Sequence, residues 1–219
     1  MKDRREVLAA FGLPLPVPEE TCERPARGPA AGRFPNHAVI THEGSRALFN
    51  DDLLVGKTVV LHCMSLRTEP AFRTAEKLAR VQPLLAGRLG RDVFFYSLSV
   101  DPEHDTVAGL RDFAARHGAG PGWLFLTGEA TVVQDLRSRM FPPMPGHAHG
   151  HGAAPAEDCS MAMFRYGNAG VGLWGAVPAV ADPEWIAQRL SWVQPGEQPA
   201  GPPRRRGPLP LRPGREGAR

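Results

Sequence analysis

The chain has 219 residues, of which 42% are hydrophobic and 22% charged, an ordinary composition for a globular protein. Its formal net charge of +3 comes from the C-terminal end, where residues 195–219 hold six arginines against two glutamates. The rest is close to neutral, so a basic nucleic-acid-binding face is not predicted. No apolar run approaches the roughly 18 residues of a membrane span.

The cysteines and the N-terminus leave the cellular compartment open. Cys22, Cys63 and Cys159 lie far apart and form no Cys-x-x-Cys pair, and an odd number disfavours a disulfide framework. Residues 1–13 superficially resemble a twin-arginine export signal. Prolines interrupt the apolar stretch early, at Pro14 and Pro16, so we favour a short helix followed by a linker.

Composition divides the chain into three parts: a flexible N-terminal segment at 1–32, a folded domain at 33–194 and a disordered Pro/Arg-rich tail at 195–219. Within the domain, hydrophobic periodicity predicts the following elements in order: a hairpin at 38–49, a strand at 58–63, a helix at 70–85, a strand at 93–100, a helix at 106–117, a strand at 123–127, a helix at 129–140, a hairpin at 162–174 and a helix at 183–193.

The alternation of strands and helices predicts an α/β domain. Right-handed crossovers would place its strands in a mainly parallel sheet closed by an antiparallel pair. This order is compatible with a thioredoxin-like fold that carries an N-terminal β-hairpin. The β-branched strand at 59–63 should be central, between 93–100 and either the hairpin around Phe164 or the strand at 123–126.

The turn after the central strand, Ser65-Leu66-Arg67-Thr68, lies where open α/β sheets place their chemistry. It contains no Cys-x-x-x-Cys, no phosphate-binding glycines and no Ser-His pair. The position of the turn therefore predicts a functional site, but the turn lacks the residues that such a site would need. Nearby, Asp101, Glu103 and Asp105 are interpreted as turn and cap residues rather than a cation site, and His62 as a structural histidine.

Several stretches together resemble the Sco/SenC family, thioredoxin-fold copper chaperones of cytochrome c oxidase assembly. The most specific are SVDPEHDT within 89–106 and PGWLFLTG within 120–128. The others are FPNHAVITHEG at 34–44, FNDDLLVGK at 49–57, ARVQ at 79–82, FRYGN at 164–168 and PAVADPEWI at 178–186. The resemblance covers about 34 to 192, and it implies a periplasmic location and a respiratory oxidase assembly partner.

The family's copper ligands, a Cys-x-x-x-Cys pair and a distal histidine, are missing. The resemblance places the cysteines near Thr68 and Phe72 and the histidine at about Ser160. None of these residues binds soft copper, so the Cu(I) chemistry of the family cannot be transferred to these positions. Cys63 does not replace the motif, because it lies inside the strand and is interpreted as a small core residue.

A second candidate metal site is the loop that precedes this position. His147, His149 and His151 alternate with small residues, and imidazole suits Cu(II) or zinc. Cys159 could add a soft ligand, as could Met161 and Met163. The alternative is a plain solvated linker.

Three functional hypotheses remain. The first is a non-enzymatic, divergent Sco/SenC-like accessory protein with a degenerate site, connected to copper handling or cytochrome oxidase assembly. The second is a thiol-disulfide oxidoreductase that uses Cys63 and Cys159, which requires their Cα atoms to lie within about 7 Å. The third is a structural partner-binding domain.

Overall fold

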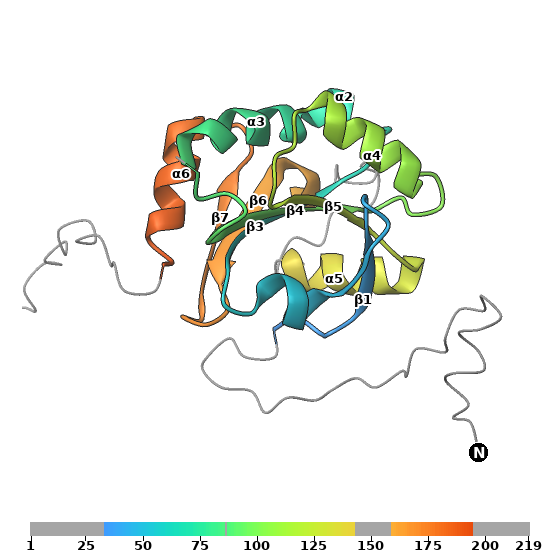
Figure 1. The fold of residues 1–219 in the computed structure, drawn as a ribbon, viewed down its shortest axis with the longest axis horizontal. Coiled ribbons are helices and arrows are strands. Elements are labelled where there is room, and N and C mark those ends of the chain that lie inside the picture. The colour runs from blue at the N-terminus through green and yellow to red at the C-terminus, as the bar shows by residue number, and fades with distance from the viewer. Residues whose placement is uncertain (1–32, 86, 143–158, 195–219) are drawn as a thin grey trace, which may run out of the picture.

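The computed structural model describes residues 33–85, 87–142 and 159–194. Through this part of the chain runs a seven-stranded sheet in the order β2-β1-β5-β4-β3-β6-β7 (Figure 1). Its strands are β1 Ala38–Thr41, β2 Arg46–Leu48, β3 Thr58–Met64, β4 Val93–Ser99, β5 Trp123–Thr127, β6 Met163–Asn168 and β7 Leu173–Pro178.

The strand predicted to be central is β3, which lies inside the sheet between β4 and β6, one place from the middle strand. It pairs in parallel with β4 and antiparallel with β6, and all seven of its residues are buried. β4 pairs in parallel with β5, while β1 joins the other side of β5 in antiparallel orientation. The two predicted hairpins are β1–β2 and β6–β7. The α/β domain is therefore confirmed, but the prediction of a mainly parallel sheet is wrong. Only β3–β4 and β4–β5 pair in parallel, and the pairs β1–β2, β1–β5, β3–β6 and β6–β7 are antiparallel.

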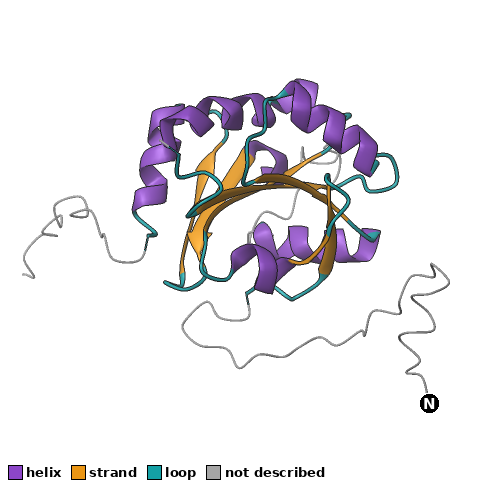
Figure 2. Ribbon diagram, in the orientation of Figure 1, coloured by secondary structure: helices purple, strands orange, loops and turns teal. Residues whose placement is uncertain are grey.

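Helices cover both faces of this sheet (Figure 2). On one face lie α2 Glu69–Phe72, α3 Thr74–Val81, α4 Val107–Arg116 and α6 Pro183–Ser191; on the other lie α5 Ala130–Met140 and the six-residue π-helix η1 Phe49–Leu54. Two short 3-10 turns, η2 Gln82–Leu85 and η3 Cys159–Ala162, complete the described elements.

Each face has its own hydrophobic core because β3 alternates its side chains between them. Val60 and Met64 pack with Leu78 and Phe125 on the side of α3 and α4. Cys63 belongs to the opposite core, which α5 covers. This two-sided burial explains why the strand shows no alternation of polar and apolar residues.

The single helix predicted at 70–85 is divided into α2, α3 and η2. Arg73 adopts a left-handed conformation (φ 53°), which ends α2 and starts α3. The buried Glu69 carboxylate accepts hydrogen bonds from the Ala75 backbone N–H and, at 2.7 Å, from the Thr74 hydroxyl. Glu69 thus caps the N-terminus of α3 from within the preceding helix, which periodicity alone does not indicate.

The predicted N-terminal segment at 1–32 and the predicted tail at 195–219 lie outside the described residues. None of the helices in the described ranges combines the length and the hydrophobicity that a bilayer crossing needs.

Candidate functional site

The turn at 65–68 lies at the carboxyl ends of the parallel strands β3 and β4. The Val100 backbone N–H donates to the Met64 carbonyl at 2.8 Å, so the two strand ends remain paired up to the turn. The Thr68 and Glu69 N–H groups then donate to the Ser65 carbonyl, at 3.1 and 2.9 Å, which begins α2. A short turn therefore connects the central strand directly to the helical layer.

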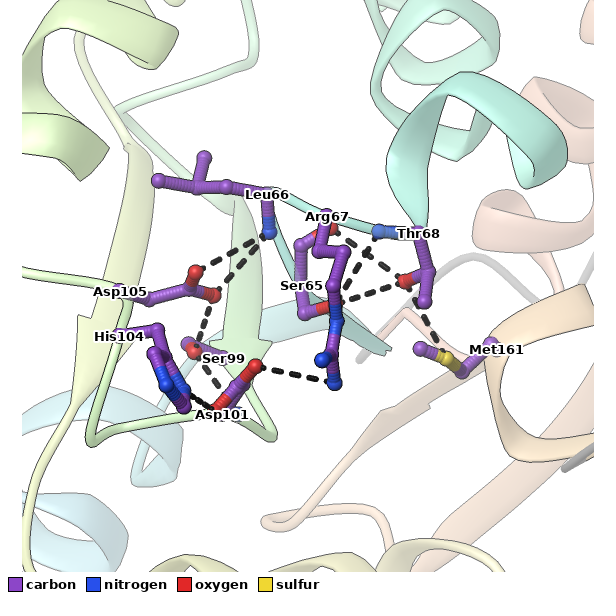
Figure 3. A network of polar contacts seen from close by, with 9 residues as sticks. All are labelled: Ser65, Leu66, Arg67, Thr68, Ser99, Asp101, His104, Asp105 and Met161. Carbon is purple, nitrogen blue, oxygen red and sulfur yellow. Dashed lines mark hydrogen bonds and ion pairs between the residues drawn. The ribbon is translucent and has the colours of Figure 1, made fainter.

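Asp105 holds one side of this turn (Figure 3). Its carboxylate accepts the Leu66 backbone N–H, at 3.1 Å to Oδ2, and the Ser99 hydroxyl at 2.6 Å. The residue is only 2% exposed. On α4, a Cβ added to Gly109 would lie 3.1 Å from the Leu66 side chain, so α4 approaches the turn closely. The carboxylate thus satisfies a backbone donor that would otherwise be buried without a partner.

On the other side the turn contacts η3. The Ser65 and Thr68 hydroxyls are 2.8 Å apart, and the Thr68 hydroxyl lies 3.6 Å from the Met161 sulfur. Figure 3 shows the Met161 side chain directed at Thr68 across the site. The structure therefore brings together the two segments in which the family resemblance placed the missing ligands.

The exposed rim of the turn carries charge. Arg67 Nη2 lies 3.3 Å from Asp101 Oδ2, and His104 Nδ1 lies 2.7 Å from Asp101 Oδ1. The hydrogen bond to Asp101, and then its charge, raise the pKa of His104 above 6.5. Asp101 and Asp105 therefore both pair with residues of the turn. The N-cap of α4 is Thr106, whose hydroxyl accepts the Gly109 N–H at 3.1 Å. The interpretation as turn residues holds for Asp101 and Asp105, but the residue that caps α4 is Thr106 and none of the three acidic residues.

The atoms that face one another at this turn are hydroxyl oxygens and a thioether sulfur. Thiolate and imidazole ligands, which hold Cu(I) firmly, are missing from the turn itself. Within 33–85, 87–142 and 159–194, no three His, Cys, Asp or Glu residues are grouped closely enough to hold a metal ion. Among the described donors at the turn, the Met161 thioether suits copper, but one such ligand beside two hydroxyls does not make a copper site.

Cys63 is separated from this turn by Met64 and lies in the opposite core. It is fully buried, and burial raises the pKa of its thiol to about 12 despite weaker opposing effects from Arg137 and a hydrogen bond with Ser160. A thiol with that pKa has almost no thiolate at neutral pH, so Cys63 as it lies is a poor nucleophile. Its contact with Ser160 brings η3, which begins at Cys159, next to the end of β3.

His62 belongs to a buried polar chain beneath the helices. Trp123 Nε1 donates to the Ser97 hydroxyl at 2.9 Å, and that hydroxyl lies 2.6 Å from His62 Nε2. The imidazole is completely buried, and burial lowers its pKa to about 4. His62 is therefore neutral at pH 7, consistent with its interpretation as a structural histidine.

The predicted metal ligands His147, His149 and His151 lie outside the described residues, and Cys159 is the first residue of η3. Of the other named positions, Thr68 lies in the turn, Phe72 ends α2 and Ser160 is buried in η3. Sequence reasoning did not single out Asp105 as a buried acceptor. Its signal would have been an acidic residue that directly precedes the N-cap of α4.

No family model matches the sequence, and no curated protein matches it either. Solved structures do match. A SCO1/SenC family lipoprotein from Bacillus anthracis str. Ames aligns with a TM-score of 0.54 at 17% identity, over 72% of this chain and 92% of that chain. Yeast Sco1 with copper bound aligns with a TM-score of 0.53 at 17% identity, over 74% and 94%. BsSco, a member of the Sco family of cytochrome c oxidase assembly proteins, aligns with a TM-score of 0.54 at 18% identity, over 70% and 88%.

The fold is that of the Sco proteins. The thioredoxin-like α/β fold expected from the family resemblance is thus confirmed over most of each neighbour's length. In this Sco fold, the turn after the central strand carries the hydroxyls of Ser65 and Thr68, and the thioether of Met161 contacts it from η3.

Proposed function

We propose that this chain is a divergent member of the Sco/SenC family, a non-enzymatic accessory protein in copper handling or cytochrome oxidase assembly. The observation that carries the proposal is the Sco fold itself, which spans 88–94% of three solved neighbours. One of those neighbours holds copper, and another belongs to a family of cytochrome c oxidase assembly proteins. The sequence stretches that resemble the family support the same conclusion.

The protein would perform this role without the usual thiol site. Thr68 presents a hydroxyl next to Ser65 and Met161, and these groups bind soft copper far more weakly than a pair of thiolates. The turn is also held closed by its own contacts, because Asp105 and Ser65 already take its backbone N–H groups. These contacts argue against metal transfer at this turn.

Metal binding, in this proposal, has moved to the histidine-rich loop. His147, His149 and His151 would hold Cu(II) or zinc, with Cys159 as a further ligand. What supports this is the position of η3, which begins at Cys159 and meets the turn through Met161. Cys159 directly precedes Ser160, the position that the family resemblance gives to the lost histidine.

The experiment measures metal content and affinity on the purified full chain. Cu(II), Cu(I) and zinc are added separately, and bound metal is quantified by mass spectrometry and calorimetry. We expect Cu(II) or zinc to bind about 1:1 at pH 7 and much more weakly at pH 5, because protons compete for imidazoles with a reference pKa of about 6.5. Affinity should be moderate, since the loop must be ordered on binding.

The decisive variant changes His147, His149 and His151 together to alanine. Its matched control changes His37, His42 and His104 to alanine, which removes the same number of imidazoles from the described domain. Loss of metal in the first variant and retention in the second supports the loop site. Equal binding in both, or none in the parent, leaves the loop as a linker. In the host, deletion of the gene should lower cytochrome oxidase activity, and unchanged activity would favour a partner-binding domain of another kind.

A further inference from the structure

Three side-chain N–H donors without a partner gather on the sheet face that α5 covers. They are Arg33 Nε, Arg165 Nε and Trp174 Nε1, each buried and each without a hydrogen-bond partner among the described residues. Buried donors are rarely left unpaired in folded proteins, and three at one place need an explanation. All three residues are half buried, so part of each side chain still reaches the surface.

The β6–β7 hairpin and the start of the described chain bring these residues together. Arg165 on β6 faces Ala176 on β7, and Trp174 lies two residues earlier on β7, on the same face. Trp174 covers Gly167, which leaves space for the indole where any larger residue would collide with it. Phe34 meets the Trp174 ring edge-on, with centroids 5.0 Å apart, and the Arg33 guanidinium lies 5.9 Å from the Phe34 ring.

The two arginines of this cluster have no carboxylate beside them among the described residues. Burial, and next the positive charge of Arg33, lower the pKa of Arg165 to about 10. In the ranges that the structure describes, neither arginine forms an ion pair with a carboxylate. Two like charges in a partly desolvated place repel each other, and an anion bound between them would remove that repulsion.

We propose that Arg33, Arg165 and Trp174 form a binding site for a doubly charged oxyanion of the phosphate class. Guanidinium groups pair with phosphate oxygens through two parallel N–H bonds, and the indole N–H supplies a further donor. A phosphate group carries a charge of about −1.5 to −2 at neutral pH, which matches two arginines. A single carboxylate would leave one positive charge uncompensated. The site is independent of the copper-related function proposed above.

The same chemistry can be supplied by free phosphate or by the phosphate headgroup of a lipid. Two arms of one experiment separate these sources. In the first arm, inorganic phosphate is titrated into the full chain, and sulfate and acetate serve as comparisons. In the second, vesicles that contain phosphatidic acid, whose phosphomonoester can carry two negative charges, are compared with vesicles of phosphatidylcholine, and phosphate is added as a competitor. Binding to the phosphatidic acid vesicles that free phosphate reverses identifies the headgroup, whereas phosphate binding without vesicle binding identifies the free ion.

The readout is the indole N–H resonance of Trp174 in a proton–nitrogen correlation spectrum, together with calorimetry. Trp174→Phe identifies that resonance by its disappearance. We expect phosphate to shift this one indole signal in a saturable way and to bind more tightly than acetate. Arg165→Gln and Arg33→Gln should each weaken phosphate binding by roughly tenfold, since each removes charge-assisted hydrogen bonds. Arg165→Lys should bind phosphate with intermediate affinity, because lysine keeps the positive charge but cannot donate the two parallel N–H bonds of a guanidinium group.

The matched control is Arg46→Gln. Arg46 is an exposed arginine on β2, at the opposite edge of the sheet, and its removal lowers the net charge equally. Arg33 lies at the end of the described domain, so Arg33→Gln tests the site even if Arg165→Gln folds poorly. If the Trp174 signal does not shift when phosphate is added up to about 10 mM, the proposal is overturned, because even a weak specific site should bind with a Kd near millimolar. Equal weakening by Arg46→Gln overturns it as well, because binding would then reflect net charge only.

Discussion

The carboxylate of Asp105 accepts the backbone N–H of Leu66 at 3.1 Å, a contact between residues 39 positions apart. It joins the turn after β3 to the segment that follows β4. We predict that Asp105→Asn destabilises the fold by about 1–3 kcal/mol, because the new amide presents donors where two donors already converge. Urea unfolding measures this loss. The control is Glu103→Gln, an exposed change expected to stay within about 0.5 kcal/mol; an equally small effect of Asp105→Asn would show that the turn does not depend on this carboxylate.

His62 should make the protein sensitive to acid. Its pKa is about 4 in the folded protein and about 6.5 in the unfolded chain. Below pH 6.5 the unfolded state takes up a proton that the folded state does not, so stability falls with pH until about pH 4. Between pH 7 and pH 5 this amounts to roughly 2 kcal/mol.

Unfolding free energies at pH 7 and pH 5 test this effect. In His62→Gln, the loss of unfolding free energy between pH 7 and pH 5 should be smaller than in the parent by the part that His62 contributes. This holds even if the substitution lowers the stability at pH 7. His104→Gln removes an exposed imidazole and should keep the acid loss. An identical pH dependence in the parent and in His62→Gln would mean that His62 is accessible to protons in the folded state.

Cys63 should be chemically inert in the native protein. Its pKa of about 12 leaves almost no thiolate at pH 7, and its complete burial blocks reagents. In a Cys22→Ser/Cys159→Ser double variant, we expect iodoacetamide to leave Cys63 unmodified in buffer and to alkylate it fully in urea. Mass spectrometry reads both states. The parent should also fail to reduce insulin; robust reduction that disappears in Cys63→Ser would instead support the oxidoreductase hypothesis.

Arg73 should be one position where glycine improves stability. It holds a left-handed φ of 53°, which costs an ordinary residue about 1–2 kcal/mol and glycine very little. We expect Arg73→Gly to stabilise the protein by about 1 kcal/mol in urea unfolding. Arg80→Gly is the matched control, because Arg73 and Arg80 both pair with Glu76. Within α3, glycine should instead destabilise by about 1 kcal/mol. Equal losses in the two variants would contradict a strained Arg73.

The strands and most helices of this protein follow from its sequence alone. The β-branched run at 58–64 has no alternation, and such a run predicts a strand buried on both faces. Helical periodicity likewise located α4, α5 and α6 within a few residues. These signals are local, because the pattern of apolar residues within a single strand or helix already determines which of its faces can be buried. The stretches that resemble the Sco/SenC family added the expectation of a thioredoxin-like fold.

Only the tertiary structure decided what surrounds the turn after β3. The Met161 sulfur reaches the Thr68 hydroxyl across 93 positions. Asp105 becomes a buried acceptor because the Ser99 hydroxyl and the Leu66 N–H from the turn after β3 both donate to it. Arg73 ends a helix that periodicity would continue, since the Glu69 carboxylate offers α3 a new cap. Such contacts depend on how distant elements dock, and the energy of a buried hydrogen bond exists only after water has been removed by that docking.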